Sequence, residues 1–392
     1  MNNFEFYTPT HVYFGRGQEE KVGQIVKSYG FQKVLVHFGG GSARKSGLLD
    51  KIEKQLTENG IAFVELGGVQ ANPVLSMVRK GIEVCRAENV DLILAIGGGS
   101  VIDSSKAIAD GYANPDVDVW DLISQKVKLT KSTPVATVLT LAASGSEMSN
   151  SAVITNEDGM LKRGYGSPYH RPLFSIMNPE LTYSVSKYQT ACGAVDIMMH
   201  TLERYFCLNQ DNDLTDRLAE GLLTAVIRAG RIAVEDPENY EARATLMWAG
   251  SLSHNDITGS GRQYMMQVHQ IEHELSGYDD KIAHGAGLAV LWPAWARFQA
   301  KNAPERFAQY AVRVWGCEMN FHDPYETALE GIDRTQAYFT SLGMPSRLRE
   351  FGIPEEACEV IAENTTFHGK RILPDYQDLD KPEILEILKA CY

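Results

Sequence analysis

Histidine and carboxylate residues recur at helical spacing in two parts of the sequence. Asp196 and His200 stand four residues apart in DIMMH, and His269 and His273 repeat this spacing in HQIEH. Residues four apart on a helix project from the same face, one turn apart. A fifth residue, His284, follows after a polar turn. One carboxylate and several imidazoles from three segments can enclose a divalent ion such as Fe²⁺ or Zn²⁺, so the pattern predicts a metal site.

The spacing alone leaves open which of these imidazoles are ligands. HQIEH resembles the HExxH motif of zinc proteases, but position 270 is Gln and not the Glu that activates water there. A protease would therefore lack its general base. A single histidine is more often structural than a ligand, and we interpret in this way His11, His37, His170, His322 and His368.

Two apolar segments end in the same Gly-Gly-Gly-Ser sequence. The second, AIGGGSVIDSSK, follows the more apolar segment and leads into a predicted helix. Glycines let backbone N–H groups approach a ligand closely, and a helix N-terminus favours an anion. This turn is our candidate for a dinucleotide pyrophosphate, with Gly97, Gly98, Gly99 and Ser100. Both the GxGxxG fingerprint and a Walker A loop are absent, which argues against an ordinary Rossmann motif and against an NTPase.

The first glycine turn, in VHFGGGSARKSG, is a candidate for the adenosine ribose. Sites for NAD usually place an Asp or Glu at the end of such a strand, where it binds the ribose 2′-hydroxyl. Here the strand end carries no acidic residue, and Arg44 and Lys45 stand just beyond it, so we expect NADP(H) to be favoured over NAD(H). The turn residues are Gly39, Gly40, Gly41 and Ser42.

A third loop, TLAASGSEMS at 140–149, follows the next apolar segment. Its hydroxyl side chains could line the nicotinamide side of a cofactor; they belong to Thr140, Ser144 and Ser146.

The elements that must position these residues differ between the two halves of the chain. In the first half, apolar strands are predicted at 33–38, 62–66, 91–96 and 134–140, with helices at about 44–58, 74–88 and 101–112. Buried strands that alternate with helices indicate a parallel sheet covered on both faces. FEFY and HVYFG, ahead of these, are expected to form a small hairpin or an edge pair.

From Ser186, a predicted helix N-cap, the periodicity is helical throughout. The predicted fold class is thus α/β plus all-α: a Rossmann-like parallel-sheet dinucleotide domain at 1–185, followed by an all-helical metal-binding domain at 186–392.

The bulk composition excludes several classes of partner. The 392 residues carry a formal net charge of −13, which argues against nucleic acid or an anionic membrane surface. The six cysteines form no CxxC pair, so neither a disulfide framework nor a cysteine zinc site is expected. The chain shows neither a signal-peptide pattern nor an apolar run of membrane-spanning length, so we expect a cytoplasmic protein.

The chain resembles the iron-containing, metal-dependent alcohol dehydrogenases, most closely their butanol dehydrogenase-like, aldehyde-reducing branch. The resemblance extends over essentially the whole sequence, from VYFGRG through GGGSVIDSSK, SGSEMSNSAVIT and LKRGYGSP. Its most specific parts are GAVDIMMHTLERYF and HQIEHELSGYDDKIAHGAGLAVLWP.

The resemblance implies an active site in the cleft between the two domains and assigns the metal to Asp196, His200, His269 and His284. His273 is then the remaining histidine, and its equivalent in the family lies near the nicotinamide and is a candidate for proton transfer. Cofactor contacts are implied at Gly97, Gly98, Gly99, Ser100, Asp103, Thr140, Leu141, Ser144, Ser146 and Lys162. The resemblance also implies a homodimer.

The expected reaction is reversible hydride transfer between NAD(P)(H) and a small, neutral primary alcohol or aldehyde of the butanol and butanal type. The metal would act as a Lewis acid. No cluster of Arg or Lys accompanies the metal segments, which favours a neutral substrate. The alternative is a metal- and NAD-dependent lyase or cyclase of the dehydroquinate synthase type, which would need basic residues to hold an acidic, phosphorylated substrate.

Overall fold

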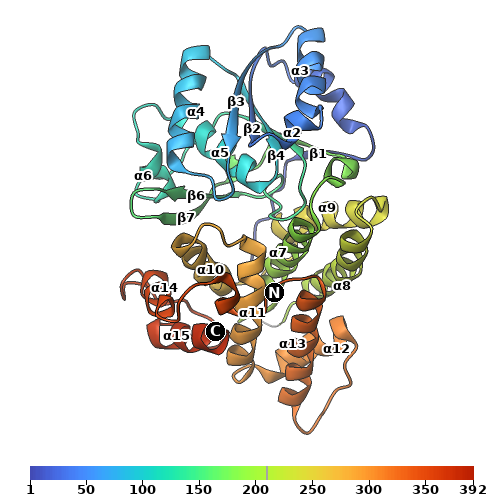
Figure 1. The fold of residues 1–392 in the computed structure, drawn as a ribbon, viewed down its shortest axis with the longest axis vertical. Helices are drawn as coiled ribbons and strands as arrows, with labels where there is room; N and C mark the ends of the chain where they lie inside the picture. Colours follow the sequence, from blue (N-terminus) through green and yellow to red (C-terminus); the bar gives the residue numbers. More distant parts are fainter. Residues whose placement is uncertain (209–210) are drawn as a thin grey trace. The chain divides into compact units, whose positions relative to one another are not determined.

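The computed structural model describes residues 1–208 and 211–392 (Figure 1). The chain forms two compact units, one made of Tyr7–Ser184 and the other of Val185–Tyr392 together with Met1–Phe6. We call them the sheet unit and the helical unit. The first six residues, which we expected to belong with the sheet, belong to the helical unit instead: the N-terminal ammonium group donates to the Asp211 carbonyl oxygen at 2.6 Å.

The sheet unit is built on a six-stranded sheet in the order β1-β8-β5-β4-β2-β3, and every adjacent pair is parallel. This confirms the predicted parallel sheet, with strand ends close to the predicted ones. The strands are β1 (His11–Phe14), β2 (Lys33–Gly39), β3 (Ala62–Val69), β4 (Leu92–Gly97), β5 (Val135–Leu139) and β8 (Phe174–Met177).

Helices cover both faces of this sheet because its strands are apolar on both sides. Val34 and Val36 of β2 pack with one set of helices, α1 (Val22–Ser28) and α3 (Leu48–Glu58). Leu35, between them in sequence, faces the opposite side and packs with another set. That second set is α4 (Leu75–Glu88), α5 (Gly99–Ala113) and α6 (Val119–Ile123).

Two features of the sheet unit differ from the prediction. The N-terminal segments form no hairpin, since β1 pairs with β8 in parallel and residues 4–7 are not in a strand. An antiparallel pair that was not predicted, β6 (Ser151–Asn156) and β7 (Leu161–Gly166), packs beside α5. The short elements of this unit are η1 (Gln18–Lys21), α2 (Ser42–Lys45), η2 (Pro168–His170) and η3 (Pro179–Thr182).

The helical unit confirms the all-α prediction for the second half: among its described residues only an isolated bridge, between Leu373 and Leu379, has β character. Its helices are α7 (Lys187–Tyr205), α8 (Asp213–Glu235), α9 (Tyr240–His254), α10 (Gln267–Tyr278), α11 (His284–Ala300), α12 (Pro304–Trp315), α13 (Pro324–Ser341), η4 (Leu348–Phe351), α14 (Ala357–Thr365) and α15 (Lys381–Ala390). Within the described residues, none of the helices combines the length and the apolar character needed to cross a lipid bilayer.

Candidate functional site

Three helices of the helical unit carry the predicted metal ligands. Ser186 is the N-cap of α7, as predicted, and its side chain accepts a hydrogen bond from the backbone N–H of Gln189 at 3.2 Å. It carries Asp196 and His200 on one face, while α10 carries His269 in its first turn. His284 is the first residue of α11.

Asp196 lies at the centre of the cluster. Its Oδ1 atom lies 3.5 Å from Nδ1 of His200, 3.6 Å from Nε2 of His269 and 3.8 Å from Nε2 of His284. Four atoms that bind a tetrahedral ion with bonds of about 2.0–2.1 Å lie about 3.4 Å apart. The spacing therefore fits a divalent ion held by these side chains.

Three of the four atoms lack any other partner. Asp196 Oδ1, His200 Nδ1 and His269 Nε2 are buried and form no hydrogen bond with a described residue. Buried polar atoms are nearly always hydrogen-bonded, because leaving one unsatisfied costs about 1–3 kcal/mol. Three such atoms that converge on one point indicate a binding site for a cation, and a carboxylate oxygen with imidazole nitrogens is a donor set that suits Fe²⁺ or Zn²⁺.

Two carboxylates, which the sequence analysis did not single out, orient the histidines. Glu203 on α7 bonds His269 Nδ1 through Oε2, and its Oε1 accepts the Val268 N–H at 2.6 Å. Glu272 on α10 bonds His284 Nδ1 in the same way. Each contact turns the other ring nitrogen toward Asp196, as such carboxylate–histidine pairs do in metal sites. Glu203 stands three residues after His200 and seven after Asp196, so helical spacing could have revealed it.

The protonation of the rings follows from their surroundings. Burial lowers the pKa of His200 well below its ordinary value, and the neighbouring imidazoles of His254 and His269 lower it further, so this ring is neutral, the form that can bind a metal. Burial also lowers the pKa of His269, but the carboxylates of Glu203 and Asp196 outweigh this effect and raise that pKa to about 9. The same two carboxylates that attract a proton would stabilise a cation bound there.

A glycine brings the third helix within reach of the first. A Cβ atom on Gly285 would collide with the backbone of Cys192 on α7. Only glycine lets the start of α11 approach α7 so closely, and this approach places His284 beside Asp196.

His273 and His254 lie next to the four predicted ligands. The centre of the His273 ring lies 5.7 Å from that of the His284 ring. A ring nitrogen of His273, a ring nitrogen of His284 and a carboxylate oxygen of Glu272 lie within 4.8 Å of one another. The His254 ring, at the end of α9, lies 4.1 Å from that of His200. From the sequence SLSHND, a place in the pocket and a role in capping or connecting helices were both open for His254, and the second was favoured; the structure places its ring beside His200. Which of these histidines bind metal and which move protons stays a prediction.

In the sheet unit, the second glycine turn joins the central strand β4 to α5. A Cβ atom on Gly99 would collide with the Ser144 side chain, and one on Gly98 would lie 3.1 Å from Cβ of Leu141. The Thr140 N–H donates to the Gly97 carbonyl oxygen at 3.0 Å. The predicted turn at 97–100 and the loop that begins at Thr140 thus pack together. No described side chain caps the N-terminus of α5, so this end fits a phosphate.

Two of the predicted cofactor residues bond each other. The Ser146 hydroxyl donates to Asp103 Oδ1 at 2.6 Å, and Asp103 Oδ2 accepts the Val153 N–H at 2.9 Å. Beneath them Lys106, fully buried, donates to the Ser146 carbonyl oxygen and to the Ser151 carbonyl oxygen, both at 2.8 Å. Burial lowers the pKa of Lys106 to about 8. These bonds fix the loop; whether Asp103 and Ser146 also contact a cofactor stays a prediction.

The first glycine turn lies at the end of β2, next to β4 in the sheet. The NADP(H) expectation assumed that Arg44 was available to a phosphate, but its guanidinium group forms an ion pair with Glu65 of β3. Lys162, also predicted to contact the cofactor, is a buried residue of β7 opposite Thr155. Ser42, the last residue of the turn, begins α2 and is exposed.

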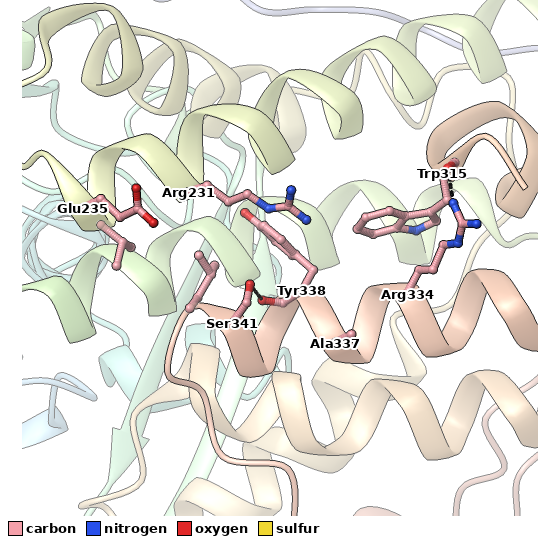
Figure 2. A pocket seen from close by; sticks show the side chains of 9 residues that line it. Arg231, Glu235, Trp315, Arg334, Ala337, Tyr338 and Ser341 are labelled. Atoms are coloured by element: carbon pink, nitrogen blue, oxygen red, sulfur yellow. Dashed lines mark hydrogen bonds between the residues drawn. The ribbon is translucent and has the colours of Figure 1, made fainter.

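A cavity of about 450 Å³ lies elsewhere, among α8, α13 and the end of α12 (Figure 2). Arg231 and Arg334 reach toward it beside the rings of Tyr338 and Trp315. None of the predicted site residues lines it, so we assign it no part in the chemistry.

Comparisons with known proteins agree with this geometry. Residues 9–179 match the family model for iron-containing alcohol dehydrogenase, and residues 190–392 match the C-terminal model of the Fe-containing alcohol dehydrogenase family. The chain is 44% identical to NADH-dependent butanol dehydrogenase A of Clostridium acetobutylicum, with all of both chains covered. It is 33% identical to an NADPH-dependent aldehyde reductase of Escherichia coli, over 97% of each chain.

A solved structure gives the same result. The crystal structure of NADH-dependent butanol dehydrogenase A from Thermotoga maritima superposes with a TM-score of 0.95 at 38% identity and covers 100% of this chain and 99% of that one. The family matches extend over both units, including both glycine turns and all the predicted metal ligands. The chain therefore belongs to the iron-containing alcohol dehydrogenase family.

Proposed function

We propose that the chain catalyses reversible hydride transfer between NAD(P)(H) and small, neutral primary alcohols or aldehydes of the butanol and butanal type. The observation that carries the proposal is the convergence of Asp196 Oδ1, His200 Nδ1 and His269 Nε2, three buried atoms without a hydrogen-bond partner among the described residues. Family membership supports an oxidoreductase that uses a nicotinamide cofactor and a divalent metal, iron by the family description.

In the proposed mechanism the metal ligands are Asp196, His200, His269 and His284. A divalent ion held there would supply a Lewis acid for the carbonyl or alcohol oxygen, and a bound nicotinamide would supply or accept the hydride. The carboxylates of Glu203 and Glu272 hold the His269 and His284 rings in the orientation that ligation requires.

His273 is the proposed proton relay. It is partly exposed, unlike the buried His200 and His269, and its ring lies 6.4 Å from that of His269. A histidine titrates near neutral pH and is suited to general acid–base catalysis, directly or through water.

The charges around the ligands support a neutral substrate. Asp196, Glu203 and Glu272 place three carboxylates in and around the histidine cluster. Against the charge of a bound divalent ion, these three carboxylates leave no net positive charge to hold an anionic substrate. A lyase or cyclase of the dehydroquinate synthase type needs to hold a phosphorylated acid, and the relatives, which are named as dehydrogenases and reductases, do not favour it.

The choice between NADP(H) and NAD(H) is the finer part of the proposal. The turn at 39–42 lacks a carboxylate, which favours NADP(H), as does the name of the NADPH-dependent relative. The relative with 44% identity is named as NADH-dependent, and Arg44 is held by acidic neighbours. We propose that the chain accepts both cofactors and that the charged side chains around Arg44 decide the preference. A homodimer and a cytoplasmic location stay predictions.

The test is a spectrophotometric assay at 340 nm of the purified protein with butanal and either NADH or NADPH. The protein is first treated with a chelator and then assayed without metal, with Fe²⁺ and with Zn²⁺. We expect oxidation of the cofactor only after metal is restored. If neither cofactor is consumed with a panel of aldehydes while metal and nucleotide still bind, the dehydrogenase proposal is wrong, because a lyase regenerates its NAD.

A further inference from the structure

Arg44 is surrounded by acidic side chains. It lies on α2, just after the glycine turn that ends β2. Its guanidinium forms an ion pair with Glu65 of β3, and its nitrogens lie 3.8 Å from Glu53 Oε1 and 3.8 Å from Asp50 Oδ1. On the remaining side, its central carbon lies 5.4 Å from the centre of the Phe38 ring. Three carboxylates thus share one guanidinium.

The cluster contains more acidic than basic side chains. Glu53 is only 18% exposed at its side chain, and its pKa is raised by burial and by the nearby carboxylate of Glu65. These carboxylates therefore compete with any other anion for Arg44. Lys45, the next residue, is exposed and pairs with none of them, so Arg44 is their ion-pair partner among the described residues.

The position of the cluster connects it with the nucleotide. In a doubly wound sheet the pyrophosphate binds after the central strand, and the neighbouring strand ends beside the adenosine ribose. Here the central strand is β4 and the neighbour is β2, paired from Val34↔Leu92 to Phe38↔Ile96. A 2′-phosphate on this ribose is normally accommodated by an arginine nearby. Arg44 has the right position, but Glu65 holds it.

We infer that Glu65 is a specificity-determining residue: by holding Arg44 in an ion pair, it weakens the binding of a 2′-phosphate and moves the preference of the enzyme toward NAD(H). The inference rests on the proposed function, since it concerns the adenosine end of the same nicotinamide cofactor. It also explains how a glycine turn without a carboxylate can accompany NAD(H): the discriminating carboxylate is not at the end of β2 but on the adjacent strand β3.

The expected effect is moderate because the pair is partly exposed, with 46% of the Arg44 side chain and 35% of the Glu65 side chain accessible. Exposed ion pairs contribute little each, and a phosphate carries more charge than a carboxylate. Removing Glu65 should therefore strengthen binding of a 2′-phosphate by about threefold to tenfold.

The experiment is isothermal titration calorimetry of the metal-loaded enzyme with two probes that differ only in the 2′-phosphate, adenosine 5′-monophosphate and adenosine 2′,5′-bisphosphate. The variants are Glu65→Gln, Arg44→Ala and the double variant. The matched control is Glu58→Gln on α3, which removes the same charge from an exposed ion pair with Lys54. The ratio of the two dissociation constants is compared across the set.

We expect Glu65→Gln to favour the bisphosphate by about threefold to tenfold relative to wild type, the double variant to lose this gain, and Glu58→Gln to leave the ratio unchanged. Arg44→Ala alone should change the ratio little. An unchanged ratio in Glu65→Gln, or a large loss of bisphosphate binding in Arg44→Ala alone, would overturn the inference while leaving the proposed function intact. If adenosine 5′-monophosphate binds to no variant and not to wild type, the proposed function itself fails, and the inference fails with it.

Discussion

Buried histidines in the two units have opposite surroundings. In the sheet unit, His37 has partners at both nitrogens, the Leu66 carbonyl oxygen at 2.7 Å and the Ser104 hydroxyl at 2.9 Å. His170 likewise contacts the Asn150 carbonyl oxygen at 3.1 Å and Asp110 Oδ2 at 2.8 Å. In the helical unit, His200 and His269 each have one nitrogen that faces Asp196 and forms no hydrogen bond with a described residue.

Whether both ring nitrogens have a hydrogen-bond partner separates structural histidines from candidate ligands better than burial or sequence spacing does. All four rings are at least nine-tenths buried, so burial alone does not distinguish them. A structural histidine satisfies both nitrogens within the fold because an unsatisfied polar group is costly. A ligand histidine satisfies one nitrogen with a carboxylate and keeps the other for an ion that the chain itself does not supply.

The largest effect is expected from His269→Ala. This change removes one proposed ligand and leaves the buried carboxylates of Asp196 and Glu203 without a counter-charge. We expect metal retention to be lost and turnover to fall by about a thousandfold or more, because Lewis-acid catalysis contributes several kcal/mol to the rate. Metal content is measured by elemental analysis after gel filtration, in parallel with the 340 nm assay. Full turnover in a metal-free variant would contradict the proposed mechanism.

His273→Asn tests the other side of the comparison, a histidine near the site that is not proposed as a ligand. Turnover should fall by about a hundredfold, because a positioned acid or base contributes at least this much. The metal should stay bound, since the four proposed ligands are intact. Loss of the metal in this variant would show that His273 is a ligand and that one of the other four is not.

Glu203→Gln tests the contact at Nδ1 of His269, the ring nitrogen that does not face Asp196. The variant keeps the size of the side chain but removes the charge that the Nδ1 atom contacts. We expect metal affinity to fall by about 10- to 100-fold, the usual effect of losing such an outer carboxylate. Competition with a chelator of known affinity measures it. Glu220→Gln, on another buried carboxylate of this unit, should leave the metal affinity unchanged.

The sequence predicted the parts of the fold that depend on local patterns. Continuous apolar runs such as 91–96 gave strands close to their true bounds, and Ser186 marked the start of α7. The same patterns could not predict that β1 pairs with β8, because that register connects residues more than 160 positions apart. β6 and β7 were missed because SAVITN and LKRGYG are half polar.

In the candidate site, too, local patterns predicted some features, while contacts between distant parts of the sequence were not predicted. Residue type and helical spacing indicated a metal site that includes Asp196 and several histidines, and the family resemblance selected His200, His269 and His284 among them. The structure brings these four residues together around one carboxylate oxygen. Arg44 was interpreted from its position in the sequence alone, and its acidic partner comes from a strand that the sequence does not place beside it. Contacts between different helices and strands determine the charge around a bound ligand, and the spacing of residues along the sequence does not predict these contacts.

His170→Leu tests the sheet-unit side of the comparison. The change removes the contact with Asp110, whose other partner is the Tyr165 hydroxyl at 2.8 Å. We expect the free energy of unfolding to fall by about 2 kcal/mol, the cost of leaving a buried polar group with fewer partners, while metal content is unchanged. Urea denaturation measures the first and elemental analysis the second. His322→Leu, at an exposed histidine, should change neither; a loss of metal in His170→Leu would remove the distinction between the two classes.

The smallest expected effect is the pH dependence of stability that a buried structural histidine, His37, contributes. Burial lowers the pKa of His37 to about 4, while the unfolded chain keeps the ordinary value of about 6.5. Between these values the unfolded state binds the additional proton, so the stability that His37 contributes is complete above pH 6.5 and is lost as the pH falls toward 4. From pH 6.5 to 5.5 this loss is about 1 kcal/mol. His37→Gln keeps a donor and an acceptor but cannot titrate, so the difference in unfolding free energy between wild type and this variant should shrink by that amount. A difference that stays constant over this range would mean that His37 is protonated as easily in the fold as in water, and that burial does not hold it neutral.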